Sequence, residues 1–277
     1  MSEPVLPVPH TEAGRAGLAA MLRAPGRALI ALDFDGTIAP IVADPAAARA
    51  HPDAIGVLRR LAPLTGTLAV ITGRPALAAV RYGGFDLVPG LIVLGHYGRE
   101  RWEAGTLTAP PPSPGVAAAG RDLPGVLAAA GAPDGTSTED KGDAVAVHTR
   151  NAAQPADALE HLRGPLAGLA ERHGLVLEPG RFVIELRPPG TDKGAALESL
   201  AAERHPGAIA FCGDDLGDEP AFRAVGALRA AGIPGLAVCS GSAEVTALAA
   251  DADLMVDGPD GVIALLSSLA AAFAARH

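Results

Sequence analysis

Two carboxylates follow a short apolar stretch near the N-terminus of the chain. The motif Asp33-Phe-Asp-Gly-Thr37 comes at the end of residues 29–33, which have the composition of a buried strand. A carboxylate beside a hard cation is a competent nucleophile toward phosphorus and forms an aspartyl phosphate. Mg²⁺ is commonly held by one or two carboxylates together with phosphate and water. The motif therefore predicts phosphate chemistry at Asp33 and Asp35, with an N-cap or an Asx turn as the alternative explanation.

Three further motifs have side chains that suit a phosphate or its counter-ion. Thr72 could cradle a phosphate with its hydroxyl and the backbone N–H groups beside it, so we include Gly73 and Arg74 among the predicted substrate-binding residues. Lys193 begins a predicted helix, where a cation opposes the helix dipole, so we expect it to neutralise a phosphoryl group instead. Residues 214–219, which follow Gly213 and begin Asp-Asp, contain four acids in six residues, a density that favours a bound cation. The alternatives are an ordinary N-cap at Thr72 and a solvated acidic turn at residues 214–219.

Lysine is rare in this sequence. Only Lys141 and Lys193 are lysines among the 22 basic residues, and all the others are arginine. Arginine cannot replace lysine where a compact point charge is needed. Both lysines are therefore candidate functional residues.

The elements that must position these motifs form a repeated pattern of strand, turn and helix. Such alternation predicts an α/β fold, a Rossmann-like parallel sheet with helices on both faces. Ligands bind such sheets beyond the carboxyl ends of the strands, which is where the polar motifs fall. The predicted buried strands are residues 29–33, 68–71, 91–94, 208–212, 235–239 and 254–256.

Residues 110–187 have a different sequence pattern from the rest of the chain. They follow a proline-rich joint, and residues 143–150 alternate between apolar and polar side chains, which is typical of an antiparallel strand. We interpret this segment as an inserted α+β cap domain, an antiparallel sheet plus two helices, within a catalytic core of residues 1–109 and 188–277. Its expected elements are helices at residues 116–130 and 155–172 and a hairpin of residues 175–178 and 182–186 with its turn at Pro179-Gly180.

Composition excludes several classes of protein. The 277-residue chain has a formal net charge of −9 and no basic cluster, which argues against nucleic-acid binding. A hydrophobic content of 49% argues against disorder, and no apolar stretch is long enough for a membrane span. The first ten residues do not resemble a signal peptide, and we expect one short helix between a loose tail and the first strand. Cys212 and Cys239 are expected to be reduced and buried, in a cytoplasmic protein.

Taken together and in this order, the four motifs resemble those of the haloacid dehalogenase superfamily. The resemblance implies that Asp33 attacks phosphorus, and that Asp35 protonates the leaving oxygen and then deprotonates the hydrolytic water. It implies that Thr72 and Lys193 hold the phosphoryl oxygens. It also implies a Mg²⁺ cofactor held by the Asp33 side chain, the Asp35 backbone carbonyl and Asp214.

Finer motifs are similar to those of trehalose-6-phosphate phosphatases. They are Asp33–Ile41 with its Ala-Pro-Ile ending, residues 95–100, Glu139–Gly142, Ala146–Arg150, Glu178–Gly180 and Glu185–Pro188. The 120 residues between Thr72 and Lys193 leave room for a cap of the kind found in the branch that acts on sugar phosphates.

This resemblance implies a role for each cap motif. Glu139, Lys141 and Glu178 would contact the distal glucose, and Arg150 would help to position the substrate. Outside the cap, we expect His96 to be a neighbour of the substrate, because it lies at the end of a predicted strand. The implied protein is a Mg²⁺-dependent phosphatase that converts trehalose 6-phosphate into trehalose in trehalose biosynthesis. We expect it to be a monomer.

Two alternatives remain at this point. A related phosphatase would act on sucrose 6-phosphate or a glycosyl phosphoglycerate. A non-catalytic sensor of the sugar phosphate would be expected to have lost Asp33, Asp35 or Lys193, and none of them is lost.

Overall fold

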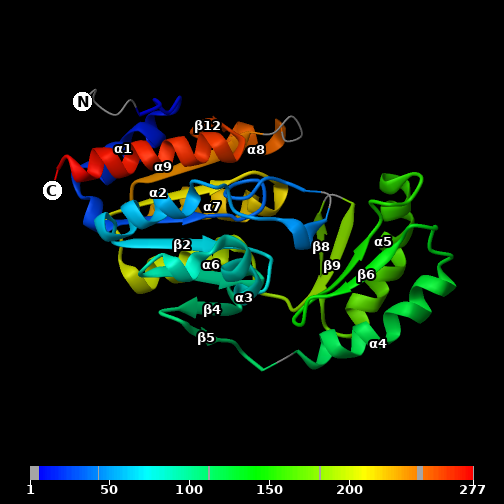
Figure 1. Cartoon of the computed structure of the whole chain (residues 1–277). Helices are drawn as coiled ribbons and strands as arrows, with labels where there is room; N and C mark the ends of the chain where they lie inside the picture. Colours follow the sequence, from blue (N-terminus) through cyan, green and yellow to red (C-terminus); the bar gives the residue numbers. More distant parts are fainter. Residues whose placement is uncertain (1–5, 43, 112, 181, 242–245, 277) are drawn as a thin grey trace. The chain divides into compact units, whose positions relative to one another are not determined.

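The computed structural model divides the chain into two compact units (Figure 1). One consists of Met1–Ala109 and Asp192–His277, and the other of Pro110–Thr191. Their interpretation as a catalytic core and a sugar-binding cap stays a prediction. The structure describes residues 6–42, 44–111, 113–180, 182–241 and 246–276.

The first unit is built on a sheet whose described strands run in the order β12-β11-β10-β1-β2-β3-β4-β5. Neighbouring strands from β12 to β3 are parallel, and β4 and β5 continue the sheet in antiparallel pairing. The predicted parallel α/β sheet is therefore confirmed. The strands are β1 (Ala28–Leu32), β2 (Thr67–Ile71), β3 (Leu91–Gly95), β4 (Glu100–Glu103), β5 (Thr106–Thr108), β10 (Ala208–Gly213), β11 (Gly235–Gly241) and β12 (Leu254–Asp257).

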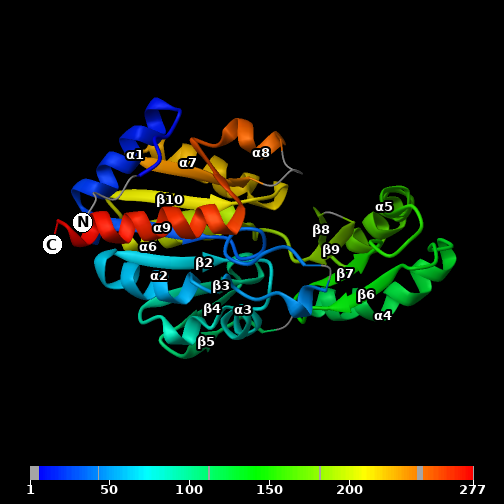
Figure 2. The same ribbon diagram turned by 45° about the horizontal axis from the view of Figure 1, so that its top comes forward.

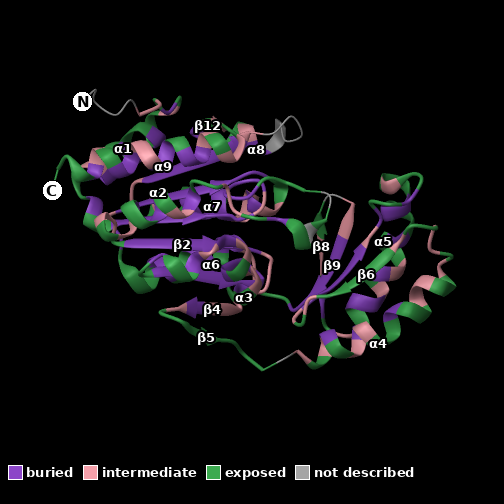
Figure 3. Ribbon diagram, in the orientation of Figure 1, coloured by how far each residue is buried: buried purple, intermediate pink, exposed green. Residues whose placement is uncertain are grey.

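Helices cover both faces of this sheet (Figures 1 and 2). Successive residues of a strand point to opposite faces, so Ile30 and Leu32 join one apolar core and Leu29 and Ala31 join the other. All four are fully buried, as the central strands are throughout (Figure 3). The first core packs against α1 (Glu12–Arg23), α2 (Ala54–Leu61), α3 (Ala76–Gly83) and α9 (Gly258–Ala274), and the second against α6 (Lys193–Arg204), α7 (Glu219–Ala230) and α8 (Thr246–Asp251).

The direction in which successive strands are added to the sheet reverses at β1. The strands that follow β1 lie on one side of it, from β2 to β3, and those that return after the second unit lie on the other, from β10 to β12. Such a switch point opens a crevice at the carboxyl ends of the strands. Asp33 follows β1 and Asp214 follows β10, so the fold places these two residues on neighbouring strand ends.

The second unit has an antiparallel sheet in the order β6-β7-β9-β8. Two helices cover one of its faces through an apolar core of their own, which confirms the expected sheet with two helices. The elements are α4 (Pro114–Ala129), β6 (Ser137–Asp140), β7 (Val145–His148), α5 (Pro155–Arg172), β8 (Val176–Gly180) and β9 (Val183–Arg187).

The predicted turn at Pro179-Gly180 is wrong. Both residues belong to β8, where Pro179 pairs with Ile184 and Gly180 with Val183. A proline is tolerated there because β8 is an edge strand of the sheet, so its missing N–H breaks no ladder of hydrogen bonds. Phe182, a turn residue before β9, has a positive φ of 57°.

The remaining expectations concern the N-terminus, the cysteines and membrane spans. The predicted short helix is α1, while residues 1–5 of the tail before it lie outside the described residues. Cys212 and Cys239 are both free thiols and both buried, as expected. Among the described residues, no helix is long and apolar enough to cross a membrane.

Candidate active site

Lys193 joins two buried carboxylates at the carboxyl edge of the sheet. Its Nζ donates hydrogen bonds to Oδ1 of Asp33 and to Oδ1 of Asp218, each over 2.7 Å. The side chain of Asp192 accepts from the backbone N–H of Ala195 at 2.8 Å and so caps α6, which makes Lys193 the first residue of that helix. The helix start thus brings the ammonium group against the end of β1.

Asp218 orients this lysine. Its Oδ2 accepts hydrogen bonds from the backbone N–H groups of Asp214 at 2.9 Å and Asp215 at 3.2 Å, within a capping box formed by Asp215 and Asp218. Both oxygens of Asp218 are therefore engaged, and the residue is fully buried. Asp218 was predicted only as one acid of a cluster, although the spacing of Asp215 and Asp218 is a signal for a capping box.

Three buried carboxyl groups lie close together here, and the single positive charge of Lys193 cannot balance three negative charges. Asp33, Asp214 and Asp218 each offer an oxygen, and these atoms lie within 4.8 Å of one another. Burial and the neighbouring carboxylates raise the pKa of Asp214 to about 10. Burial also raises the pKa of Asp33, against the opposing charge of Lys193. Buried oxygen donors with excess negative charge suit a hard divalent cation.

The lysine itself stays charged in this cluster. Burial alone would lower the pKa of Lys193, but the carboxylates of Asp218 and Asp33 raise it well above its ordinary value. The site therefore contains a permanent cation beside the candidate nucleophile, which suits it to an anionic phosphoryl group.

Gly36 leaves room for one of the carboxylates. It has a positive φ of 76°, and a Cβ built on it would lie 2.0 Å from Oδ2 of Asp214. Its carbonyl oxygen accepts a hydrogen bond of 2.7 Å from Oγ of Ser240, a buried residue of β11. Ser240 is not among the predicted site residues. A serine near the end of a predicted strand carries no signal of its own.

Arg74 holds the side chain of Asp35. Its Nε and one terminal nitrogen donate to the two carboxylate oxygens over 2.6 and 2.7 Å, a bidentate geometry that fixes the carboxylate plane. The guanidinium also lies over the rings of Phe34 and Tyr82, 5.5 and 5.4 Å from their centroids. These contacts hold the side chain of Asp35 outside the carboxylate cluster. The role of the Asp35 backbone carbonyl as a metal ligand stays a prediction.

The turn after β3 supports the Thr72 motif. The buried Thr72 accepts a hydrogen bond from the Tyr97 N–H through its carbonyl at 3.0 Å, and the carbonyl of Arg74 accepts from the His96 N–H at 2.9 Å. His96 and Tyr97 both have positive φ, 47° and 58°, which is uncommon for side-chain-bearing residues. A Cβ on Gly73 would lie 2.7 Å from the Tyr97 hydroxyl, so this ring packs directly on the motif.

The predicted sugar-contacting residues lie in the second unit. Glu139 lies in β6, one residue before the end of that strand, and Glu178 lies in β8. Lys141 follows β6 and forms an ion pair with Glu185. Glu178 forms an ion pair with Arg187, and Glu139 contacts His148 at 3.0 Å. Arg150 is exposed after β7.

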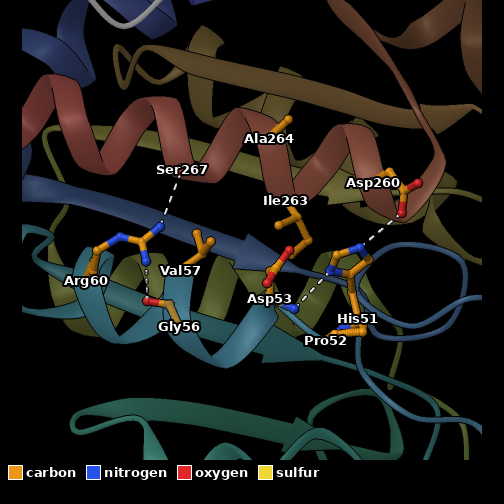
Figure 4. A pocket seen from close by; sticks show the side chains of 10 residues that line it. All are labelled: His51, Pro52, Asp53, Gly56, Val57, Arg60, Asp260, Ile263, Ala264 and Ser267. Carbon is orange, nitrogen blue, oxygen red and sulfur yellow. Dashed lines mark hydrogen bonds and ion pairs between the residues drawn. The ribbon is translucent and has the colours of Figure 1, made fainter. Parts of the chain in front are cut away.

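A surface cavity of about 420 Å³ lies elsewhere in the first unit, between α2 and α9 (Figure 4). Its polar groups bind one another. His51 contacts Asp260 at 3.1 Å, and Arg60 donates to Ser267 at 3.3 Å. None of the predicted site residues lines this cavity. The cavity is therefore not where the predicted chemistry gathers.

Comparison with known proteins identifies the family. The sequence profile of the trehalose-phosphatase family matches residues 126–254. A trehalose-phosphate phosphatase of Mycobacterium avium is 36% identical over 219 residues, 73% of this chain and 52% of that protein. The chain belongs to the trehalose-phosphatase family.

Trehalose-phosphatase relatives differ in length from this chain. It spans about half the length of the curated trehalose-phosphate phosphatases that it matches. It also matches an uncharacterized glycosyl hydrolase of Mycobacterium tuberculosis, with 38% identity over 215 residues, 72% of this chain and 15% of that protein.

The trehalose-phosphatase fold is also found in a solved structure. The C-terminal domain of Candida albicans trehalose-6-phosphate phosphatase superposes with a TM-score of 0.76 and 20% identity, and covers 96% of this chain and 98% of that domain. At this identity the likeness shows the fold, and it agrees with the predicted sheet and insertion.

In this trehalose-phosphatase family member, the first unit brings together two groups of predicted residues. One group is Asp33, Lys193 and Asp214, and the other is Asp35 with Thr72, Gly73, Arg74 and His96. The second unit contains Glu139, Lys141 and Glu178. Their roles toward a substrate stay predictions.

Proposed function

We propose that this chain is a phosphatase that hydrolyses trehalose 6-phosphate to trehalose and inorganic phosphate. The observation that carries the proposal is the contact of the Lys193 ammonium with the buried Asp33 carboxylate at a topological switch point, in a member of the trehalose-phosphatase family. A carboxylate in such a place can attack phosphorus, while the adjacent ammonium neutralises the phosphoryl oxygens.

The proposed reaction has two steps. An oxygen of Asp33 bonds to phosphorus as the bond to the sugar oxygen breaks, and Asp35 gives its proton to the departing alkoxide. A water molecule, deprotonated by Asp35, then attacks the aspartyl phosphate and releases inorganic phosphate and the Asp33 carboxylate. Arg74, which holds Asp35 in place, keeps its carboxylate oriented between the two steps. Thr72 and Lys193 bind the phosphoryl oxygens.

The buried carboxylates also support a Mg²⁺ cofactor. Asp33 and Asp214, with the backbone carbonyl of Asp35, would hold the ion, and Asp218 would keep Lys193 and the loop at residues 214–215 in position. When bound, the ion would neutralise charge on the phosphoryl group. Glu139, Lys141, Glu178 and Arg150 are proposed to bind the sugar hydroxyls, which carboxylates and cations are suited to recognise.

The decisive experiment replaces the proposed nucleophile. Asp33→Asn keeps the size of the side chain but removes the attacking oxygen anion, so phosphate release from trehalose 6-phosphate should fall by at least about a thousandfold. Rapid acid quenching should trap a phosphoenzyme in the wild type and none in the variant. The matched control, Asp86→Asn at an exposed position, should behave as the wild type.

Two results would contradict the proposal in different ways. An Asp33→Asn variant that turns over normally would remove the aspartyl phosphate from the mechanism. Faster phosphate release from sucrose 6-phosphate or a glycosyl phosphoglycerate than from trehalose 6-phosphate would assign a different sugar phosphate to the same mechanism.

The setting in which the enzyme works is also a proposal. We propose a monomeric enzyme in the cytoplasm. The two cysteines, which are free and buried, support the cytoplasmic location. Light scattering during size-exclusion chromatography and fractionation of the source cells test these two points.

A further inference from the structure

The sheet of the second unit has one apolar face and one polar face. Val145, Val147, Ile184 and Leu186 point into the core beneath α4 and α5. The residues between them must point to the opposite face. The strand register places Glu139, Ala146, Glu185 and Glu178 opposite one another in a single row across all four strands. Three carboxylates therefore share the polar face of this sheet.

Each predicted sugar-binding side chain on this face is paired with an oppositely charged or ionisable neighbour. Lys141 pairs with Glu185, and Glu178 pairs with Arg187. Glu139 contacts His148 at 3.0 Å and lies 4.0 Å from the Lys141 ammonium. Two of these partners, Glu185 and Arg187, lie two residues apart on β9 and hence on the same face.

The two partners on β9 are more deeply buried than the predicted sugar-binding side chains. Glu185 and Arg187 are only 7% and 6% exposed, although both carry charge. The side chains of Lys141, Glu178 and Glu139 are more accessible, with 17%, 25% and 45% of their surfaces exposed. Burying a charge is costly unless it is paired, so the ion pair with Lys141 stabilises the buried Glu185. The ion pair with Glu178 likewise stabilises the buried Arg187, whose guanidinium also donates to the hydroxyl of Thr191.

Pairing still leaves hydrogen-bonding capacity for a ligand. The Lys141 ammonium has three donors, and a carboxylate such as Glu178 can accept several hydrogen bonds. An unrestrained lysine on a connecting loop would lose rotamer freedom on binding a sugar hydroxyl. A lysine already held by a buried carboxylate has lost most of that freedom beforehand.

We propose that Glu185 and Arg187 are positioning residues that determine sugar specificity by fixing Lys141 and Glu178 on the polar face. This inference rests on the proposed function. It assigns to β9 a role different from direct contact with the sugar, because the two residues act through the side chains that they hold.

The experiment compares two substrates in the full-length enzyme. Trehalose 6-phosphate needs sugar recognition, whereas p-nitrophenyl phosphate offers only the phosphoryl group. Glu185→Gln should raise KM for trehalose 6-phosphate by about tenfold to a hundredfold, as expected for a disturbed charge-assisted hydrogen bond. The ratio of kcat/KM for the sugar phosphate to that for p-nitrophenyl phosphate should fall by the same factor. The matched control is Glu160→Gln, which removes an exposed ion pair with Arg163 on α5 and should leave this ratio unchanged.

A double-mutant cycle separates positioning from a merely structural role. If Glu185 acts through Lys141, then Glu185→Gln should have little further effect on the ratio in a Lys141→Ala background. Glu185→Asp, which keeps the charge, should recover part of the ratio. Arg187→Lys tests the second pair, because lysine keeps the charge but loses the planar fork that binds Glu178.

The outcomes distinguish this inference from the proposed function. A wild-type enzyme that hydrolyses p-nitrophenyl phosphate but not trehalose 6-phosphate overturns the proposed substrate and the inference with it. An active wild type whose Glu185→Gln and Arg187→Lys variants keep the wild-type ratio overturns the inference alone. Equal losses on both substrates, or a Glu185→Gln effect that persists in the Lys141→Ala background, would show a structural role and also overturn it.

Discussion

The ammonium of Lys193 occupies a position that an arginine side chain cannot fill in the same way. One nitrogen atom makes two hydrogen bonds of 2.7 Å, to Asp33 and to Asp218, in a site where the lysine is 5% exposed. A guanidinium spreads its charge over a planar fork of larger volume. The substitution therefore keeps the charge and changes its geometry.

We predict that Lys193→Arg lowers kcat by about a hundredfold, the loss typical of one misplaced electrostatic contact at a reacting group. Steady-state phosphate release measures this effect. Arg163→Lys, at an exposed position of α5, is the control for exchanging the two cations and should be neutral. A Lys193→Arg enzyme with near wild-type kcat would show that only the charge matters.

Metal dependence should follow from the raised pKa of Asp214. This pKa is about 10, against an ordinary value of 3.8, so the metal-free folded state retains a proton that the unfolded chain releases. The contribution of Asp214 to the free energy of unfolding is therefore present below about pH 4 and is lost as pH rises toward about 10.

We predict that Mg²⁺ raises Tm more strongly at about pH 9 than at about pH 6, because the ion binds the ionised carboxylates in place of that proton. Thermal melts with Mg²⁺ and with EDTA at both pH values check this, and EDTA should also abolish phosphate release. Activity that survives exhaustive chelation would contradict a metal cofactor.

At the scale of elements, the site depends on contacts between strand ends. Ser240 at the end of β11 donates to the carbonyl of Gly36, and Gly36 leaves room for Asp214 at the end of β10. Asp33 in turn donates through its backbone N–H to the carbonyl of Cys212 on β10, at 2.8 Å. These bonds join three strand ends into one support for the carboxylates.

We predict that Ser240→Ala lowers the free energy of unfolding by about 1–3 kcal/mol, since it leaves a buried carbonyl oxygen without its donor. The same change should reduce kcat several-fold through the loop that carries Asp33 and Asp35. Ser240→Thr keeps the hydroxyl and should recover part of kcat, and Ser267→Ala on α9 is the control. Urea denaturation and steady-state kinetics measure the two effects. Lost stability with unchanged kcat would limit Ser240 to a structural role.

Sequence patterns predicted the buried parallel strands well and the exposed strands poorly. The central strands consist of apolar residues on both faces, a signal that β4 lacks because only Trp102 among its four residues is buried. The hairpin of β4 and β5 was therefore not predicted. The pairing of Arg74 with Asp35, and of Arg187 with Glu178, joins residues 39 and 9 positions apart, and no local pattern encodes such contacts.

At the scale of the whole molecule, the chain combines a discontinuous unit with a continuous one. The second unit, Pro110–Thr191, is one segment of roughly 80 residues, a size at which many domains fold alone. Its buried apolar residues come from α4, α5, the strands β7 and β9, and Leu175, so its core requires no residue of the first unit. The chain's single tryptophan, Trp102, lies in the first unit.

We predict that residues 110–191, expressed alone, fold cooperatively and give a well-dispersed amide NMR spectrum. Leu162→Ala should destabilise this fragment by about 2–5 kcal/mol, because Leu162 is fully buried in its core. In the full-length chain the same substitution should leave the Trp102 fluorescence melt of the first unit nearly unchanged, since the two units have separate cores. A collapsed spectrum from the fragment, or a shifted Trp102 melt, would mean that the two units fold as one.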